Sequence, residues 1–302
     1  MAVTVHLGAH KTASTHLQQS LRALASPMRG AGIHYLDVRH LRRWGHRLDD
    51  SLGERPSAER LRGIWQRHLD AAAEIWPEIL ISEENILGSI RREALMGPAG
   101  IYPHAAARVD RLCAMLRRRP VELFLAVREP LAFLASAFSM QLEGGLARDF
   151  GAYVGDFDPA GLSWTGLAER LLAVEGVARL VVWRYEDYRA LRPALLRRLL
   201  PGALAGRAPD PRPAVVGLSQ AAHDAIRQGL AADPGADLAA LAREAKAMFP
   251  RSAYPGRLQP LDAAAARRVR AAYGADIARL GRLDRVMLLQ PGEAGAVQGA
   301  AG

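Results

Sequence analysis

The loop after the first apolar stretch carries residues that can bind a phosphate or sulfate group. Residues 8–15 read GAHKTAST and stand between an apolar stretch, residues 2–7, and an amphipathic one, residues 12–25. A strand-to-helix turn gathers unpaired backbone N–H groups at the helix N-terminus, where the helix dipole favours an anion. The side chains add one ammonium and three hydroxyl groups, from Lys11, Thr12, Ser14 and Thr15. The loop therefore predicts an anion cradle; alternatively, the hydroxyls only cap the helix and the lysine lies on the surface.

A second anion-binding arrangement follows the apolar run at residues 121–127. Arg128 stands at the tip of this run, and Pro130 is tolerated at the start of the helix that follows. Ser136 lies eight residues after Arg128, roughly two turns into that helix. A guanidinium gives bidentate hydrogen bonds and a hydroxyl adds a third, so the two side chains can hold one phosphate. Alternatively, Arg128 pairs with Glu129 or caps a neighbouring helix. Two such turns on one sheet favour a ligand with two separate phosphate groups.

The first loop departs from the phosphate loop of nucleotide triphosphatases. That motif, G-x-x-x-x-G-K-[ST], needs a glycine directly before the lysine. His10 stands in that place, no glycine lies at the required distance before Lys11, and the loop is shorter. The match is therefore partial and argues for a different phosphate-bearing ligand. A nucleotide-dependent phosphotransferase or kinase of related fold is kept as an alternative function, as is a non-catalytic nucleotide-binding module.

Two adjacent carboxylates, Glu83 and Glu84, follow the apolar run at residues 78–82. Neighbouring side chains in an extended segment point to opposite sides, so only one of them can face a pocket at the strand tip. A carboxylate of suitable pKa can act as a general base. Alternatively, the acidic pair caps a helix. His6 and His10 are further proton acceptors, although a histidine in a strand or tight loop more often makes a structural hydrogen bond.

These side chains need a sheet whose strand ends lie side by side. Short apolar runs predict strands at residues 2–7, 78–82, 121–127 and 178–183. Helical patterns separate them, at residues 57–73, 104–119, 131–142 and 164–175. The alternation predicts an α/β fold, a central parallel sheet with helices on both faces, and a ligand at the carboxyl ends of the strands.

The last third of the sequence has a different pattern. From residue 193 onward it predicts helices only, at residues 194–200, 219–231, 236–248 and 261–280. We expect one domain over residues 1–290, with this helical part packed on the sheet. Residues 291–302 have too little apolar surface to order themselves and are expected to be a disordered tail.

Composition narrows the function classes. The 302 residues are 50% hydrophobic with a net charge of +9, but only two are lysines, so 38 of the 40 basic residues are arginines. Because arginine is enriched throughout, clusters such as residues 117–119 indicate a solvated helix end rather than a nucleic-acid partner. The single Cys113 excludes an intramolecular disulfide and a cysteine-cluster metal site. No uninterrupted apolar stretch approaches the ~18 residues of a membrane span. We expect a cytoplasmic protein of unknown oligomeric state.

Together the motifs resemble a known family. HLGAHKTASTHLQ, residues 6–18, followed by R-x-P with a serine eight residues after the arginine, resembles the sulfotransferases that use 3′-phosphoadenosine 5′-phosphosulfate. The likeness is strongest to their bacterial, carbohydrate-type branch. Residues 181–200, VVWRYEDYRALRPALLRRLL, are similar to that family's strand and Tyr-Glu-Asp stretch. His16 departs from the pattern, since many members carry a smaller residue there.

The resemblance implies a P-loop NTPase-like three-layer sandwich that transfers a sulfuryl group from this donor to a hydroxyl or amine of a carbohydrate or small-molecule acceptor, without a metal. It implies that the 5′-phosphosulfate is bound by His10, Lys11, Thr12, Ala13, Ser14 and Thr15. The 3′-phosphate would be bound by Arg128 and Ser136 and, by looser analogy, Arg257. Lys11 would stabilise the leaving phosphate. The base would be Glu84, whose S-x-E-N setting is closer to the family's, or else Glu83.

Overall fold

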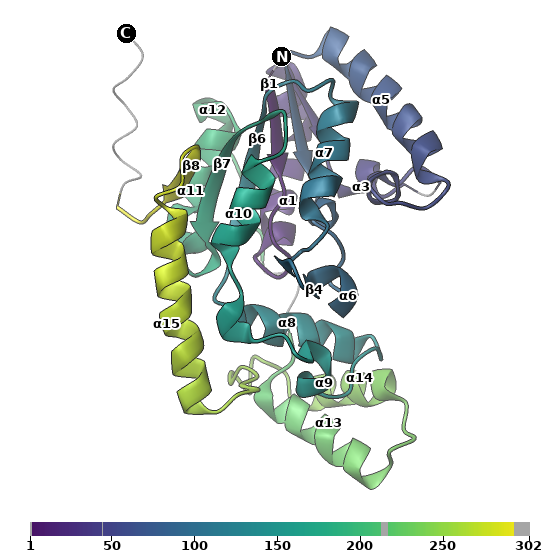
Figure 1. Ribbon diagram of the computed structural model, residues 1–302, viewed down its shortest axis with the longest axis vertical. Coiled ribbons are helices and arrows are strands. Elements are labelled where there is room, and N and C mark those ends of the chain that lie inside the picture. The colour runs from purple at the N-terminus through teal and green to yellow at the C-terminus, as the bar shows by residue number, and fades with distance from the viewer. Residues whose placement is uncertain (1, 44, 213–216, 293–302) are drawn as a thin grey trace.

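A parallel sheet forms the centre of the molecule. The computed structural model describes residues 2–43, 45–212 and 217–292 (Figure 1). Six strands lie in the order β2-β3-β1-β6-β7-β8, and every neighbouring pair is parallel. The strands are β1 Ala2–His6, β2 Ile33–Leu36, β3 Glu78–Ser82, β6 Val121–Val127, β7 Val177–Arg184 and β8 Val286–Leu289; β4 Met96–Gly97 and β5 Gly100–Ile101 form a separate antiparallel ribbon. The predicted α/β fold with a parallel central sheet is confirmed.

Strand order decides where a ligand can bind. After β1 the chain adds β2 and β3 on one side, then crosses to add β6, β7 and β8 on the other. The direction of winding therefore reverses at β1, which lies between β3 and β6. A crevice at the carboxyl ends of the strands is expected at such a reversal. The loops after β3, β1 and β6 consequently lie side by side, and these are the loops that carry the predicted site residues.

Helices account for most of the remaining chain. They are α1 Ser14–Arg22, α2 Ala25–Gly30, α3 Val38–Leu41, α4 Leu48–Ser51, α5 Ala58–Ile75, η1 Glu84–Ile86, α6 Arg92–Leu95, α7 Ala105–Met115, α8 Pro130–Glu143, α9 Phe150–Val154, η2 Pro159–Gly161, α10 Trp164–Leu172, η3 Tyr185–Asp187, α11 Tyr188–Leu199, α12 Gly202–Ala205, α13 Gln220–Ala232, α14 Leu238–Met248 and α15 Ala263–Leu280. Within the described ranges, no helix has both the length and the apolarity to cross a bilayer.

Two hydrophobic cores cover the two faces of the sheet. On one face, α1, α2, α11 and α12 pack on alternate strand residues such as Leu80, Phe124 and Val181. On the other, α5, α7, α10 and α15 pack on the intervening residues, such as Ile81 and Leu123. Because successive strand side chains point to opposite faces, apolar runs without alternation are what a sheet buried on both sides requires.

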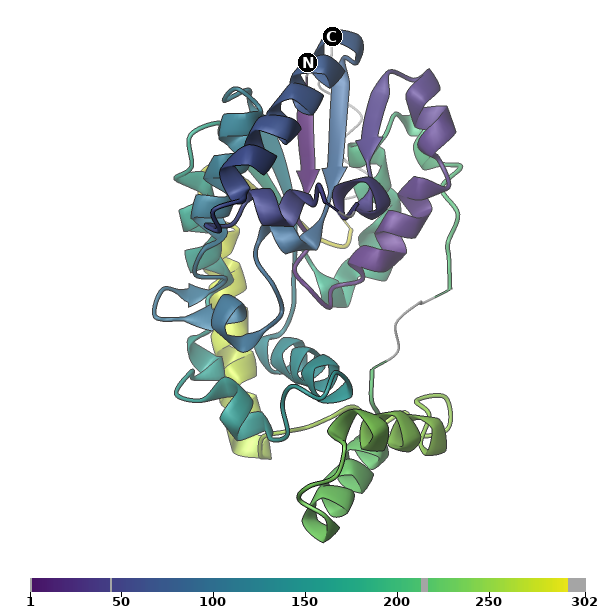
Figure 2. The ribbon, with the colours of Figure 1, turned by 90° about the vertical axis from the view of Figure 1, so that its right-hand side faces the viewer.

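The helical C-terminal part extends beyond the strand ends. Helices α13 and α14 pack on each other and lie beyond α8, at the end of the molecule away from the sheet (Figures 1 and 2). Two hydrogen bonds join the start of α13 to the end of α14 and the segment after it. Ser219 Oγ donates to the Phe249 carbonyl at 2.7 Å, and Gln220 N donates to the Gly256 carbonyl at 2.9 Å. The segment after α14 is thereby held beside the start of α13.

Three expectations need correction. The sequence predicts neither β2 nor β8, so the statement that only helices follow residue 193 is wrong at β8. The first helix begins at Ser14 rather than Thr12, and α11 begins at Tyr188 with Pro193 inside it. Of the predicted disordered tail, residues 293–302 lie outside the described part of the chain.

Candidate active site

The loop between β1 and α1 presents a row of backbone N–H groups. Positive φ values at Gly8, Lys11 and Ala13, of 46°, 63° and 65°, curl the loop back on itself. Ala13 is the N-cap of α1 and its side chain offers no capping bond. Within the described part of the chain, the N–H groups of residues 11–16 find no acceptor; the first amide of α1 to do so is that of Leu17. Such a concave row at a helix N-terminus favours an anion.

The loop is held in this shape from behind. Thr12 Oγ1 donates to the Ala9 carbonyl at 2.5 Å, and Ser14 Oγ donates to the same carbonyl at 3.4 Å. Thr12 is 2% exposed, so its hydroxyl stabilises the loop and only its backbone N–H remains for a ligand. Neither hydroxyl caps α1. The Thr12 hydroxyl was predicted to bind the ligand or, alternatively, to cap α1. It does neither, because it bonds the Ala9 carbonyl.

His10 is fixed on both of its ring nitrogens. Its backbone N donates to the Tyr102 hydroxyl at 3.1 Å, and that hydroxyl lies 2.8 Å from Nδ1. Nε2 lies 3.1 Å from Asn85 Oδ1, which can only accept, so that Nε2 carries the proton and donates this hydrogen bond. Burial lowers the pKa of His10. His10 is thus a neutral residue that braces the loop, which argues against its serving as the free proton acceptor.

His6 has a structural role as well. Nδ1 lies 2.7 Å from Ser82 Oγ, and the ring stacks on Trp183 with centroids 6.0 Å apart. Burial lowers the pKa of His6 to about 4. His6 belongs to the base of the loop and does not line the cavity described below.

A cavity of about 1260 Å³ opens in front of the loop. Its wall includes the predicted residues His10, Lys11, Ala13, Ser14, Thr15, Glu84, Arg128 and Ser136. Lys11 is half-buried in this wall, and among the described residues its ammonium makes no hydrogen bond or ion pair. Burial lowers the pKa of Lys11, with Glu143 opposing and Arg128 adding to the shift. The structure therefore brings one unpaired cation to the row of N–H groups.

Arg128 connects the two predicted anion-binding turns. Its Nη1 donates to the Lys11 carbonyl at 2.7 Å, and the guanidinium lies 4.5 Å from the centroid of the Tyr185 ring. The predicted alternative, pairing with Glu129, is absent from the described contacts because that carboxylate caps α8, accepting from the N–H groups of Leu131 and Ala132 at 3.1 and 2.8 Å. Arg128 and Ser136 thus line one cavity with the loop, as two anion-binding turns on one sheet require.

The adjacent carboxylates are separated by the turn that follows β3. Glu83 is 1% exposed and lies outside the cavity wall, and its side chain accepts from the N–H of Asn85 at 3.0 Å as the N-cap of η1. The side chain of Glu84 is 16% exposed and faces the cavity. The capping alternative therefore describes Glu83, and Glu84 is the carboxylate placed to meet a bound molecule.

The cavity is more positive than its formal charges suggest. Each carboxylate in its wall already has a partner in the protein: Glu84 accepts from Gln18 and Arg42, Glu129 from the N-terminus of α8, Glu143 from Lys246 and Glu186 from Tyr273, and Asp210 pairs with Arg192 at 3.5 Å. Among the described residues, no carboxylate lies within 4.0 Å of five cationic side chains in the wall: Lys11, Arg128, Arg189, Arg251 and Arg257. Their charge is left for an anionic ligand.

Arg251 and Arg257 reach the cavity from the segment held beside α13. Burial lowers the pKa of Arg128, and the nearby charge of Arg257 lowers it further. Burial and Arg257 likewise lower the pKa of Arg251. An anion bound among the three guanidinium groups would relieve this repulsion. The family resemblance predicts Arg257 here only by loose analogy. Arg251 was not predicted, because neither spacing nor composition distinguishes it from the other arginines.

Known proteins give no further guide to this site. The chain matches no protein-family model, no curated protein and no solved structure. No group of three or more His, Cys, Asp or Glu side chains in the described ranges is arranged to hold a metal ion. The function must therefore be argued from the geometry of the cavity itself.

Proposed function

We propose that the protein is a sulfotransferase that moves a sulfuryl group from 3′-phosphoadenosine 5′-phosphosulfate to a hydroxyl or amine of a carbohydrate or small-molecule acceptor. The observation that carries this proposal is the presence of two anion-binding points in one cavity. The first is the row of N–H groups at residues 11–16 with Lys11; the second is Arg128 with Ser136, Arg251 and Arg257. A donor with phosphate groups at both its 5′ and 3′ positions matches the two points.

The assignment of residues follows from their places in the wall. The loop amides, Lys11, Ser14 and Thr15 bind the 5′-phosphosulfate. Arg128, Ser136, Arg251 and Arg257 bind the 3′-phosphate. Reversal of the sheet at β1 with the anion loop directly after it supports a P-loop NTPase-like arrangement. We further propose that the enzyme is cytoplasmic.

In this mechanism the acceptor oxygen or nitrogen bonds to sulfur as the bond from sulfur to the 5′-phosphate oxygen breaks. The electron pair of that bond stays on the phosphate, where Lys11 and the loop N–H groups stabilise the developing charge. Glu84 takes the acceptor's proton, because it is the carboxylate that faces the cavity from the tip of β3. Both groups are in place before reaction, so their contribution needs no reorganisation of the loop.

A nucleotide-dependent phosphotransferase is the second candidate, and the geometry of Thr12 speaks against it. In the P-loop motif the hydroxyl after the lysine binds Mg²⁺. Here Thr12 Oγ1 is buried, donates to the Ala9 carbonyl and lies outside the cavity wall. A loop of this shape can hold phosphate oxygens, but the hydroxyl that follows the lysine is turned away from the position where the motif would bind the metal.

Ligand-induced stabilisation tests the proposal. Melting curves should be recorded with 3′-phosphoadenosine 5′-phosphate, with adenosine 5′-phosphate, which lacks the 3′ group, and with ATP and Mg²⁺. A ligand at 100 times its Kd stabilises a protein by about 2.7 kcal/mol. We expect 3′-phosphoadenosine 5′-phosphate to raise the melting temperature most. In Arg128→Met it should raise the melting temperature no more than adenosine 5′-phosphate does. A shift from ATP and Mg²⁺ that equals or exceeds that of the bisphosphate contradicts the proposal. Binding without turnover of any acceptor would instead indicate a non-catalytic nucleotide-binding module.

A further inference from the structure

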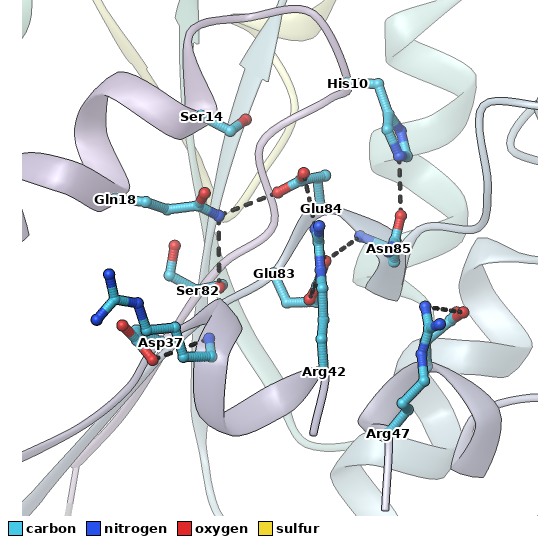
Figure 3. Close-up of polar contacts among 12 residues, drawn as sticks. His10, Ser14, Gln18, Asp37, Arg42, Arg47, Ser82, Glu83, Glu84 and Asn85 are labelled. Atoms are coloured by element: carbon cyan, nitrogen blue, oxygen red, sulfur yellow. Dashed lines mark hydrogen bonds and ion pairs between the residues drawn. The ribbon is translucent and has the colours of Figure 1, made fainter. Parts of the chain in front are cut away.

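Arg42 reaches from the segment after α3 to the turn that follows β3. Its Nε donates to Glu83 Oε2 at 2.7 Å and its Nη2 donates to Glu83 Oε1 at 2.6 Å. The same Nη2 donates to Glu84 Oε1 at 2.9 Å (Figure 3). One planar guanidinium therefore bridges both carboxylates, a geometry that lysine cannot reproduce because its ammonium is a single point charge.

Glu84 is held from the opposite side by α1. Gln18 Nε2 donates to Glu84 Oε2 at 3.0 Å and lies 3.5 Å from the Ser82 carbonyl (Figure 3). Each oxygen of Glu84 thus has a fixed donor, from Arg42 on one and Gln18 on the other. Since a carboxylate oxygen has two lone pairs, each keeps one for a proton from the cavity side.

We propose that Arg42 is a positioning residue of the transfer reaction, which bridges the two carboxylates and so keeps Glu84 ionised and facing the bound acceptor. This inference rests on the proposed sulfotransferase function. Glu83 acts in it only as the buried anchor: its carboxylate fixes the fork of Arg42, and the fork in turn fixes Glu84.

The charges around Glu84 explain why the bridge is needed. The titratable groups that face Glu84 are Arg42, His10, His6, Tyr102 and its neighbour Glu83. Burial by itself raises the pKa of Glu84, but the charge of Arg42 is the largest of the opposing contributions, which together lower the pKa. Burial raises the pKa of Glu83, and Arg42 opposes this shift too. Without Arg42, two neighbouring buried carboxylates would repel each other and favour protonation.

The expected effect of losing Arg42 has a definite sign. A base works only when it is deprotonated, so activity falls as the pH drops through the pKa of Glu84. Losing an opposite charge within ~4–6 Å raises a carboxyl pKa by about 1 to 3 units. In Arg42→Gln the acidic limb of the pH profile of kcat/KM should therefore move upward by at least ~1 pH unit. At pH 8 the variant should still have most of the activity of the unsubstituted protein. At a pH one unit below the new limb, the loss should approach about tenfold.

The test combines two measurements on the full chain. The first is a titration of the Glu84 carboxyl carbon by NMR, assigned with Glu84→Gln, which needs no turnover. The second is the pH profile of transfer from the donor to an acceptor found by screening. Both are made for the unsubstituted protein, Arg42→Gln and Arg42→Lys. Arg43→Gln is the matched control, because Arg43 is exposed and makes no ion pair with any described residue.

We expect the titration midpoint and the acidic limb to rise together in Arg42→Gln, to rise less in Arg42→Lys, and to stay fixed in Arg43→Gln. An unchanged midpoint, or a loss of activity that is equal at every pH, overturns the inference and assigns Arg42 a purely structural role. Retained stabilisation by 3′-phosphoadenosine 5′-phosphate shows that the variants are folded. A shifted midpoint in a protein that transfers no sulfuryl group overturns the proposed function, and with it the link from the bridge to catalysis.

Discussion

Gly8 is the residue on which the shape of the anion loop most directly depends. Its φ is +46°, and a Cβ built there would lie 2.4 Å from Ser14 Oγ and 3.1 Å from His6 Nε2. An alanine at a left-handed position costs about 1–2 kcal/mol. The contact with Ser14 adds an overpacking cost of about 1–3 kcal/mol, because the loop around it is already close-packed. Gly8→Ala should therefore destabilise the protein by roughly 2–5 kcal/mol.

Two further variants separate the backbone cost from the contact. Gly100→Ala is the control, since Gly100 has a φ of +90° but no heavy atom within 4 Å of a built Cβ. It should cost only the backbone part, about 1–2 kcal/mol. In Gly8→Ala with Ser14→Ala the atom at 2.4 Å is gone and the nearest remaining neighbour is His6 Nε2 at 3.1 Å. The double variant should therefore regain about 1–3 kcal/mol relative to Gly8→Ala alone.

Calorimetry measures stability, and titration with inorganic pyrophosphate or 3′-phosphoadenosine 5′-phosphate measures anion binding. At about 2–4 °C per kcal/mol, Gly8→Ala should melt at least ~4 °C below the unsubstituted protein. It should also bind both anions more weakly, whereas Gly100→Ala should bind them normally. If the double variant is no more stable than Gly8→Ala, the contact with Ser14 does not shape the loop. If Gly8→Ala binds both anions normally, the loop is not the cradle.

The other predictions concern charge. If the proposed mechanism holds, Lys11 stabilises the charge that develops on the leaving phosphate, so Lys11→Met should lower kcat of sulfuryl transfer by about 10²–10³-fold and Lys11→Arg should stay closer to the unsubstituted enzyme. Steady-state kinetics with labelled donor measure this, and full activity of Lys11→Met refutes the role. Arg128→Met should mainly weaken 3′-phosphoadenosine 5′-phosphate binding, by about 1.5–3 kcal/mol or roughly 10–100-fold in Kd by calorimetric titration; an unchanged Kd contradicts the assignment. His6 has a pKa lowered from 6.5 to about 4, so the unfolded chain takes up a proton below pH 6.5 that the folded protein takes up only near pH 4. As the pH falls between these values, the free energy of unfolding should therefore decrease by up to about 3 kcal/mol. Urea titrations at several pH values measure this dependence, and His6→Gln should remove the part that His6 causes. An identical pH dependence in the variant would show that His6 does not cause it.

The strands that the sequence predicts are those buried on both faces. Residues 121–127 and 78–82 contain the apolar runs LFLAV and ILI, and they form β6 and β3 with the predicted bounds. The two strands of the central sheet that were missed, β2 and β8, are its short edges; the two-residue strands β4 and β5 of the separate ribbon were also not predicted. In β8 every residue is only partly buried, and in β2 His34 interrupts the apolar pattern. An edge strand buries less surface, so its sequence is under weaker constraint, although VMLLQ is the same kind of signal as EILIS and would have revealed β8.

Spacing predicted which side chains of the site come together but not how each is used. Gly8 to Thr15 follows β1, and Arg128 and Ser136 follow β6, so the neighbouring strand ends bring them to one cavity. The sequence contains no sign that the Thr12 hydroxyl turns inward, since positive φ values at Lys11 and Ala13, on either side of it, have no local sequence pattern. It also contains no sign of the bridge from Arg42 to Glu83, which joins residues 41 positions apart. Contacts of that kind depend on how the loops fold over the sheet.

The net charge of the protein indicates a ligand only when the partners of the individual charged side chains are considered. A net charge of +9 carried almost wholly by arginine indicates no partner by itself, because arginine is enriched throughout the sequence and some of these side chains are paired, as Arg117 is with Asp70 at 2.9 Å. In the cavity, carboxylates such as Glu84 have donors, whereas cations such as Lys11 and Arg251 have no carboxylate within 4.0 Å among the described residues. An anion entering the cavity therefore meets donors without competing acceptors. This local imbalance, rather than the total charge, is the physical reason to expect an anionic nucleotide here.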